Sequence, residues 1–143
     1  MTIIGTWKLK SSVREDVATG ERYNLTTLGE HPEGYLGYAE DGRMYGIMVA
    51  AERPRSSRRE QAPTDDEALM LYRSMVAYAG TYTVEGNKVT HHVDISWNGA
   101  WVGGDQVRFF TLEGDTLTIK TERTKSPIDG REGVAILVWQ RVR

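Results

Sequence analysis

Turn-forming residues interrupt this chain about every 8 to 12 residues, and the segments between them alternate apolar with polar side chains. The clearest case is the hairpin predicted over residues 34–39 and 43–50, where Asp41-Gly42 supplies the positive φ angles of a tight turn. Such spacing is typical of an antiparallel barrel or sandwich. Because successive hairpins follow without a long crossover, we predict a mainly β protein, an antiparallel up-and-down barrel of about eight strands.

The other predicted strands come from the same alternation. The first covers residues 3–13 and has a mostly apolar inner side. Tyr23 and Leu25 make a short strand or a loop across a barrel mouth. Later strands are expected at 81–84, 88–97, 106–112, 116–122 and 132–142.

The two ends of the chain suggest how such a barrel closes. Trp7 can plug one end, and Gly5 lets another group come close. Arg141, in the last strand, could lay its guanidinium over an indole. Pairing of the first and last strands would leave no free sheet edge. The plainer alternative is a tryptophan in any small β core.

One segment has a helical pattern. The sequence from Thr64 to Glu67 is a capping box, with acidic residues in the first turn. Apolar residues at helical spacing follow, which predicts an amphipathic helix of about four turns that ends at Gly80. These residues are Leu69, Tyr72, Met75, Val76 and Ala79. We expect one helix, placed after the third strand.

Composition narrows the class of function. With 143 residues the chain is expected to form a single domain, residues 1–143. The net charge of −2 gives no reason to expect nucleic acid or an anionic membrane as partner, and the absence of Cys excludes disulfides and thiolate catalysis. No secretory leader and no membrane-spanning apolar run are found. We therefore expect a cytoplasmic protein without a membrane partner.

A group of arginines and a pair of adjacent histidines could in principle bind phosphate or a metal ion, but both have simpler interpretations. Arginines in residues 52–63 indicate a solvated loop rather than a phosphate or nucleic-acid site, because no aromatic residues interleave with them. They are Arg53, Arg55, Arg58 and Arg59. His91 and His92 point to opposite faces of a strand, so they cannot share one metal ion. We expect no metal and no cofactor.

A set of short motifs is spread over nearly the whole chain. They are Gly5-Thr6-Trp7-Lys8-Leu9, Gly34-Tyr35-Leu36-Gly37-Tyr38, Asp41-Gly42-Arg43-Met44, Tyr78-Ala79-Gly80-Thr81-Tyr82, Val89-Thr90-His91-His92-Val93, Trp101-Val102-Gly103-Gly104-Asp105-Gln106-Val107-Arg108 and Val138-Trp139-Gln140-Arg141. Through these motifs the chain resembles the lipocalin-like domain family, small bacterial and fungal relatives of the calycin barrels. The resemblance implies the barrel fold, with the helix as a lid over one opening or a flank beside it. Secreted lipocalins usually have a signal peptide and often a disulfide, and this chain has neither, which argues against extracellular transport.

His91 and Arg108 are the candidate catalytic residues. Strand alternation places His91 inside, either as a satisfied core residue or as a proton donor or acceptor. His92 is expected outside or hydrogen-bonded to Asp94. Alternation does not decide the direction of Arg108. It pairs with an acid such as Asp105 or Glu122, or it meets an anionic ligand group.

The remaining candidates are aromatic residues and methionines that suit a pocket for a planar or apolar molecule. Together with His91 and Arg108, the ligand-binding candidates are Tyr38, Met44, Met48, Tyr72, Tyr82, Trp97, Trp101 and Phe110.

Three functions fit these residues. The first is binding of a small, mainly apolar or aromatic molecule in the barrel. The second is a cofactor-independent isomerase, cyclase or lyase for a polyketide- or terpenoid-like substrate. There His91 would act as acid or base, and Arg108 or a tyrosine would stabilise an oxyanion. The third is a structural role without a ligand, with a homodimer formed through an outer sheet face.

Overall fold

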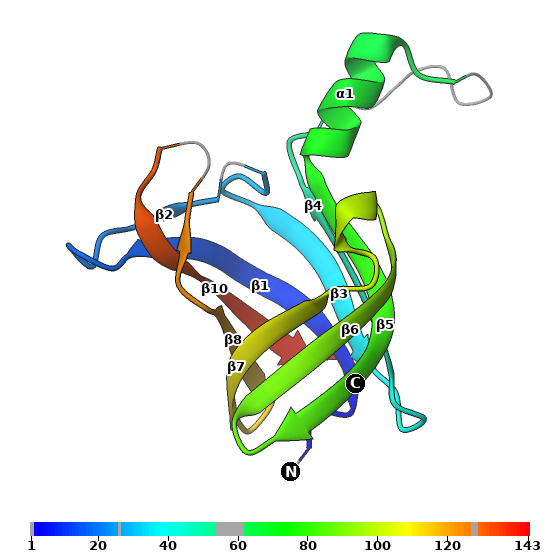
Figure 1. Cartoon of the computed structure of the whole chain (residues 1–143), viewed down its shortest axis with the longest axis vertical. Coiled ribbons are helices and arrows are strands. Elements are labelled where there is room, and N and C mark those ends of the chain that lie inside the picture. Colours follow the sequence, from blue (N-terminus) through cyan, green and yellow to red (C-terminus); the bar gives the residue numbers. More distant parts are fainter. Residues whose placement is uncertain (1, 26, 54–61, 127–128) are drawn as a thin grey trace.

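The computed structural model describes residues 2–25, 27–53, 62–126 and 129–143. These residues form ten strands, one α-helix and one turn of 3-10 helix (Figure 1). The strands are β1 (Gly5–Asp16), β2 (Arg22–Asn24), β3 (Pro32–Tyr38), β4 (Arg43–Ala50), β5 (Met75–Glu85), β6 (Lys88–Ser96), β7 (Asp105–Glu113), β8 (Thr116–Thr121), β9 (Thr124–Lys125) and β10 (Glu132–Arg141). The helices are α1 (Asp65–Arg73) and the 3-10 turn η1 (Gly99–Trp101).

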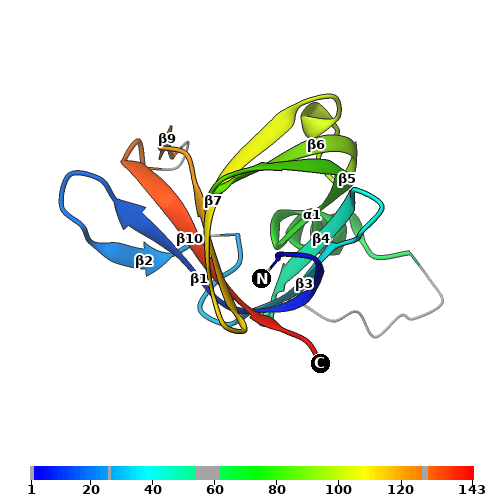
Figure 2. The same cartoon turned by 90° about the horizontal axis from the view of Figure 1, so that it is seen from below.

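Eight of the strands close an antiparallel barrel, which confirms the predicted architecture. Neighbours run in the order β1-β3-β4-β5-β6-β7-β8-β10, and β10 then pairs with β1. The short strands β2 and β9 pair with the ends of β1 and β10 and lie outside this ring. Figure 2 looks along the barrel and shows the ring of strands.

The end of the barrel near the N-terminus is closed by Trp7 and Arg141. Trp7 is fully buried, and its indole N–H donates to the Ile3 carbonyl over 2.8 Å. The Arg141 guanidinium lies 4.3 Å from the centre of the Trp7 ring and donates to the Ile4 carbonyl. Gly5 has φ +137°, and a Cβ there would come within 2.8 Å of Arg141 Nη1. Close approach of this side chain therefore requires glycine.

The first hairpin turn differs in detail from the prediction. Gly42 has φ +89°, whereas no residue other than glycine has a positive φ in the described part of the chain, so Asp41 does not. Instead the Asp41 carboxylate accepts the Arg43 N–H over 3.0 Å. The predicted turn needs two residues with positive φ, whereas only Gly42 has one here. The curvature of the loop therefore comes from a single left-handed glycine.

The helix begins as predicted but follows a different strand and ends early. Thr64 and Glu67 form the capping box. The helix follows β4, the fourth strand in chain order, because residues 22–24 form the additional strand β2. It ends at Arg73 rather than at Gly80, since residues 75–81 pair with β4 and complete the sheet.

The error has a physical reason. Val76 fits a helical spacing with Tyr72 and equally a two-residue period with Tyr78, and the backbone hydrogen bonds available beside β4 decide between the two. Gly80 is not a helix stop, because a Cβ there would collide with the carbonyl oxygen of His92 on β6. Its role is to allow close approach of two strands at a bulge.

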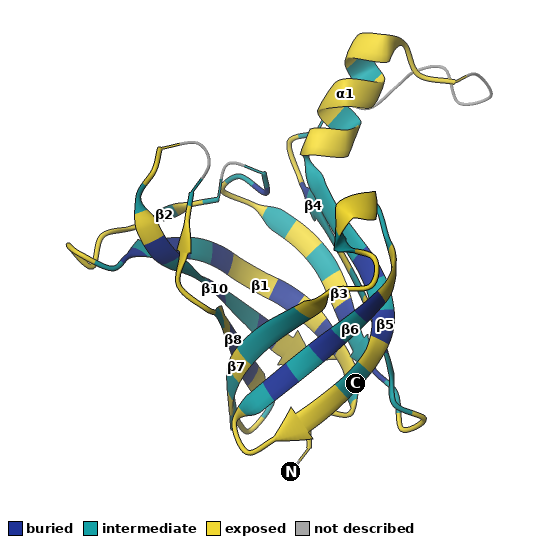
Figure 3. Ribbon diagram, viewed as in Figure 1, coloured by how far each residue is buried: buried dark blue, intermediate teal, exposed yellow. Residues whose placement is uncertain are grey.

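Helix α1 projects beyond the barrel and buries none of its residues (Figures 1 and 3). It therefore flanks the barrel rather than fitting into it. In the preceding loop, Arg53 donates to the Leu71 carbonyl of this helix over 3.0 Å. Residues 54–61 of the predicted arginine loop, which include Arg55, Arg58 and Arg59, lie outside the described residues. Among the described helices, none is long and apolar enough to cross a membrane.

Candidate functional site

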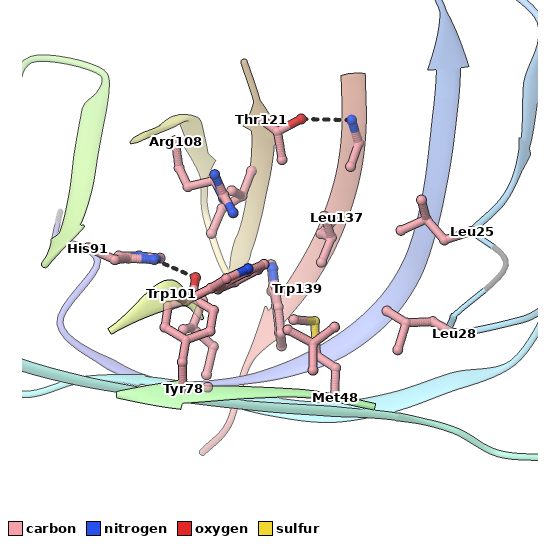
Figure 4. A pocket seen from close by; sticks show the side chains of 15 residues that line it. Leu25, Leu28, Met48, Tyr78, His91, Trp101, Arg108, Thr121, Leu137 and Trp139 are labelled. Atoms are coloured by element: carbon pink, nitrogen blue, oxygen red, sulfur yellow. Dashed lines mark hydrogen bonds between the residues drawn. The ribbon is translucent and has the colours of Figure 1, made fainter. Parts of the chain in front are cut away.

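A cavity of about 140 Å³ lies inside the barrel (Figure 4). Each barrel strand except β1 contributes to its lining, and the loop after β2 adds Leu25 and Leu28. The cavity lies away from the closed base because Trp7 and the fully buried Met44 already fill that end. Most of the wall is apolar, including Leu36, Met48, Ile119 and Leu137.

The polar part of the wall centres on His91. Its side chain is 2% exposed and points inward from β6. Tyr38 Oη lies 2.6 Å from Nε2, and Tyr78 Oη lies 2.7 Å from Nδ1. Both ring nitrogens are therefore held by hydroxyl groups, which fixes the ring in place. Figure 4 shows His91 meeting Tyr78 at the side of the cavity opposite Leu25 and Leu28.

Burial keeps this group of side chains uncharged. It lowers the pKa of His91 from 6.5 to about 3, with the positive charge of Arg108 as a second cause and His92 as a third. Burial also raises the pKa of Tyr38 well above its ordinary value, and Tyr78 adds to that shift. The pKa of Tyr78 is raised by burial too, against the opposing charge of Arg108. At neutral pH all three side chains are neutral.

Arg108 reaches the same cavity from β7. Its guanidinium donates to the Val107 carbonyl over 3.0 Å and to Gln106 Oε1 over 3.1 Å. The ion pairs in the described part of the chain do not join it to Asp105 or Glu122, the acids that the sequence suggested as partners. Asp105 is instead bonded to His92.

Aromatic side chains extend from the cavity toward the outer surface. Trp101, on η1, packs edge-on to Tyr78 with ring centres 5.4 Å apart and lines the cavity. Trp97 packs against Trp101 at 5.0 Å but lies at a groove on the outer face of the sheet. Tyr72, on the exposed helix α1, packs against Trp97 with ring centres 6.3 Å apart. Of these three candidates, only Trp101 lines the cavity.

The other candidates divide between the core and a different groove. Tyr38 is buried and reaches the cavity only through His91. Met44 is part of the packed base, whereas Met48 lines the cavity. Tyr82 and Phe110 lie by a groove near the N-terminus, and Tyr82 donates to the Ala39 carbonyl over 2.8 Å. The structure thus brings together four of the candidates, His91, Met48, Trp101 and Arg108.

His92 lies on the outer face, and the partner suggested for it is wrong. Its Nδ1 is 2.8 Å from Asp105, and its Nε2 is 3.1 Å from the Thr83 hydroxyl. Asp94 is held by Arg43 over 2.6 Å. Residues two apart on a strand share a face, but hydrogen bonding across the sheet gave each of them a closer partner. Among the described residues, no three His, Asp or Glu side chains gather as a metal site would require.

Sequence reasoning missed two important side chains. Tyr78 was assigned to the helix, so its inward direction in β5 was not recognised. Trp139 was assigned to the last strand without a place in the site, yet it is 2% exposed and lines the cavity. Alternation with Leu137 on the same strand was the signal that could have revealed it.

The sequence model of a lipocalin-like domain matches residues 4–142, and the chain therefore belongs to the lipocalin-like domain family. The resemblance noted in the sequence is thereby confirmed. Among curated proteins, the chain is similar to the 4'-hydroxy-3'-methoxypropiophenone carrier protein ppsC of Aspergillus oryzae. The two are 30% identical over 87 residues, and the match covers 55% of this chain and 78% of that protein.

Proposed function

We propose that this protein binds a small, mainly apolar or aromatic molecule inside its barrel. The observation that carries the proposal is the internal cavity, with its apolar wall and one group of polar side chains. Ligand sites typically combine such walls with a few placed polar groups that fix orientation. An apolar cavity of about 150 Å³ can hold benzene, so about 140 Å³ accommodates a single aromatic ring.

The similarity to a carrier supports binding without chemical change. The name of that relative describes a carrier of an aryl ketone, which is an aromatic molecule with a few polar groups. We therefore extend the proposal to a carrier role for an aromatic ligand. The cytoplasmic location, the absence of a nucleic-acid partner and the homodimer stay predictions.

The enzymatic alternative has no observation in its favour. Both nitrogens of His91 face tyrosine hydroxyls, so the imidazole has no free nitrogen to offer a substrate. Its pKa of about 3 also makes it a weak base at neutral pH. The catalytic roles of His91 and Arg108 stay predictions.

Filling the cavity should weaken binding. Ala135 lines the cavity, and Ala135→Leu adds three carbon atoms to that wall. Ala77 lies on the outer face of β5, so Ala77→Leu is a matched control. Titration of 4'-hydroxy-3'-methoxypropiophenone, followed by tryptophan fluorescence, should show saturable binding to the unmodified protein and to Ala77→Leu. Ala135→Leu should weaken it at least about tenfold, because overpacking leaves no room for the ring.

Native mass spectrometry of the freshly purified protein provides a second measurement that requires no choice of probe. A bound mass that disappears in Ala135→Leu would support the proposal. Equal affinity in the two variants would place the ligand outside the barrel and overturn it.

A further inference from the structure

Tyr38, His91 and Tyr78 together have one more polar hydrogen than the hydrogen bonds between them require. Tyr38, His91 and Tyr78 are neutral, so each hydroxyl carries one hydrogen and the imidazole carries one on either Nδ1 or Nε2. The three groups are joined by two hydrogen bonds. Two hydrogens are consumed, and the third must point away from the network.

The surroundings decide which group holds the spare hydrogen. If Nε2 carried the imidazole hydrogen and donated to Tyr38, the spare hydrogen would be that of Tyr38. Tyr38 is 1% exposed, does not line the cavity, and has no other hydrogen-bond acceptor among the described residues. A buried hydroxyl hydrogen without an acceptor is unfavourable.

The other tautomer avoids this cost. Tyr38 then donates to Nε2, and Nδ1–H donates to the oxygen of Tyr78. The spare hydrogen belongs to Tyr78, which lines the cavity and can direct it toward the interior. Tyr38 and His91 would act as positioning residues that turn the Tyr78 hydroxyl into a donor aimed at a ligand.

Two further donors face the same space. Trp139 lines the cavity, and its Nε1–H is buried without a hydrogen-bond partner in the described part of the chain. Arg108 donates to Val107, to Gln106 and to the Tyr78 hydroxyl oxygen, which leaves two of its five N–H hydrogens to donate elsewhere. Figure 4 shows both side chains among those that line the cavity together with Tyr78.

The same part of the cavity wall has few acceptor atoms that are not already hydrogen-bonded. The Thr121 hydroxyl donates to the Glu122 carbonyl and accepts the Ala135 N–H. In the preferred tautomer, both nitrogens of His91 are occupied. The polar side of the cavity therefore has an excess of donors, and a ligand that fits it must supply acceptors.

We propose that Tyr78, Trp139 and Arg108 form a donor site that selects apolar or aromatic ligands carrying an acceptor oxygen without a hydrogen, as in a ketone. The inference rests on the proposed function, because it specifies the polar group of the molecule bound in the cavity. It adds that His91 acts through Tyr78 and does not contact the ligand.

The tautomer can be measured without any ligand. His31→Asn together with His92→Asn leaves His91 as the only imidazole, since the chain has three histidines. Long-range proton–nitrogen correlation NMR at pH 7 should then show hydrogen on Nδ1 and a bare Nε2. Hydrogen on Nε2, or on both nitrogens, would overturn the inference.

Selectivity is tested with acetophenone and with ethylbenzene, which has a similar shape but no oxygen. Tyr78→Phe should weaken acetophenone binding about 3- to 10-fold, the range expected for one hydrogen bond, and change ethylbenzene binding less than about twofold. Tyr35→Phe, on an exposed side chain of β3, is the matched control and should change neither.

The outcomes separate the two proposals. If both probes bind and Tyr78→Phe affects them equally, the donor site is wrong while binding in the cavity stands. If neither probe binds, the proposed function fails for ligands of this size, and the tautomer measurement still decides the assignment of the spare hydrogen.

Discussion

Lowering the pH from 7 to 5 should destabilise the folded protein through His91. In the folded chain burial holds the pKa of this imidazole at about 3, whereas its ordinary value is 6.5. Between these values the unfolded chain binds a proton that the folded chain does not. The free energy of unfolding must therefore fall as the pH falls from about 6.5 toward 3, and the contribution is retained above 6.5.

The size of the effect follows from the same two values. With pKa values of 6.5 unfolded and about 3 folded, linkage predicts a loss of about 2 kcal/mol between pH 7 and pH 5. This window avoids the carboxylates with shifted pKa values. Asp16, Asp94 and Asp115 have their pKa values lowered below 3.8, mainly by hydrogen bonds from arginines, so their contributions are lost only at lower pH.

Urea unfolding at pH 7, 6 and 5 measures this effect directly. In His91→Gln the free energy of unfolding should no longer show the decrease between pH 7 and pH 5 that His91 causes. The variants are compared by this change with pH, not by their absolute stability. His31→Gln is a control at an exposed histidine and should retain that part. If His91→Gln does not fold, NMR of the unmodified protein replaces it: the His91 imidazole signals should stay unchanged from pH 7 down to about pH 4.

Two results would refute the reasoning. One is equal stability of the unmodified protein at pH 7 and pH 5. The other is an undiminished pH dependence in His91→Gln, which would assign the proton uptake to another group.

Two further predictions concern the frame that holds the cavity. Gly80→Ala should lower the free energy of unfolding, measured with urea, by about 1–3 kcal/mol, because the new methyl group collides with the His92 carbonyl. Gly37→Ala is its control, since nothing lies within 4 Å of the added carbon. It should change the free energy of unfolding by less than about 0.5 kcal/mol in the same assay. Arg141→Lys should cost about 1–2 kcal/mol by thermal unfolding, since lysine cannot both stack on Trp7 and donate to the Ile4 and Thr2 carbonyls. Arg143→Lys, at an exposed ion pair with Asp115, should cost less than about 1 kcal/mol, and an equal loss in both arginine variants would contradict this account of barrel closure.

Local chemistry explains which predictions from sequence were correct. The capping box needs only Thr64 and Glu67 three residues apart, and it forms as predicted. Strand alternation identified the barrel because one face of each strand must be buried and the other must meet water. The predicted segments 88–97 and 106–112 correspond closely to β6 and β7.

The candidate site was less predictable because it depends on register between strands. Tyr38, Tyr78 and His91 come from three strands, and only the pairing of β3, β4, β5 and β6 brings their side chains together. Aromatic composition alone could not separate Trp101, which lines the cavity, from Trp97, which lies at the outer groove. Sequence reasoning therefore gave a set of residue types from which the fold selected a few.

The sequence by itself determined the antiparallel barrel, the start of the helix and the placement of Trp7 and Arg141 in the first and last strands. These depend on periodicity and on contacts between neighbouring residues, which a linear pattern records. Tertiary structure decided that residues 75–80 form a strand, that Asp105 rather than Asp94 meets His92, and where the cavity lies. Each of these depends on hydrogen bonding and packing between residues distant along the chain, and such contacts outweigh local preference when they form together.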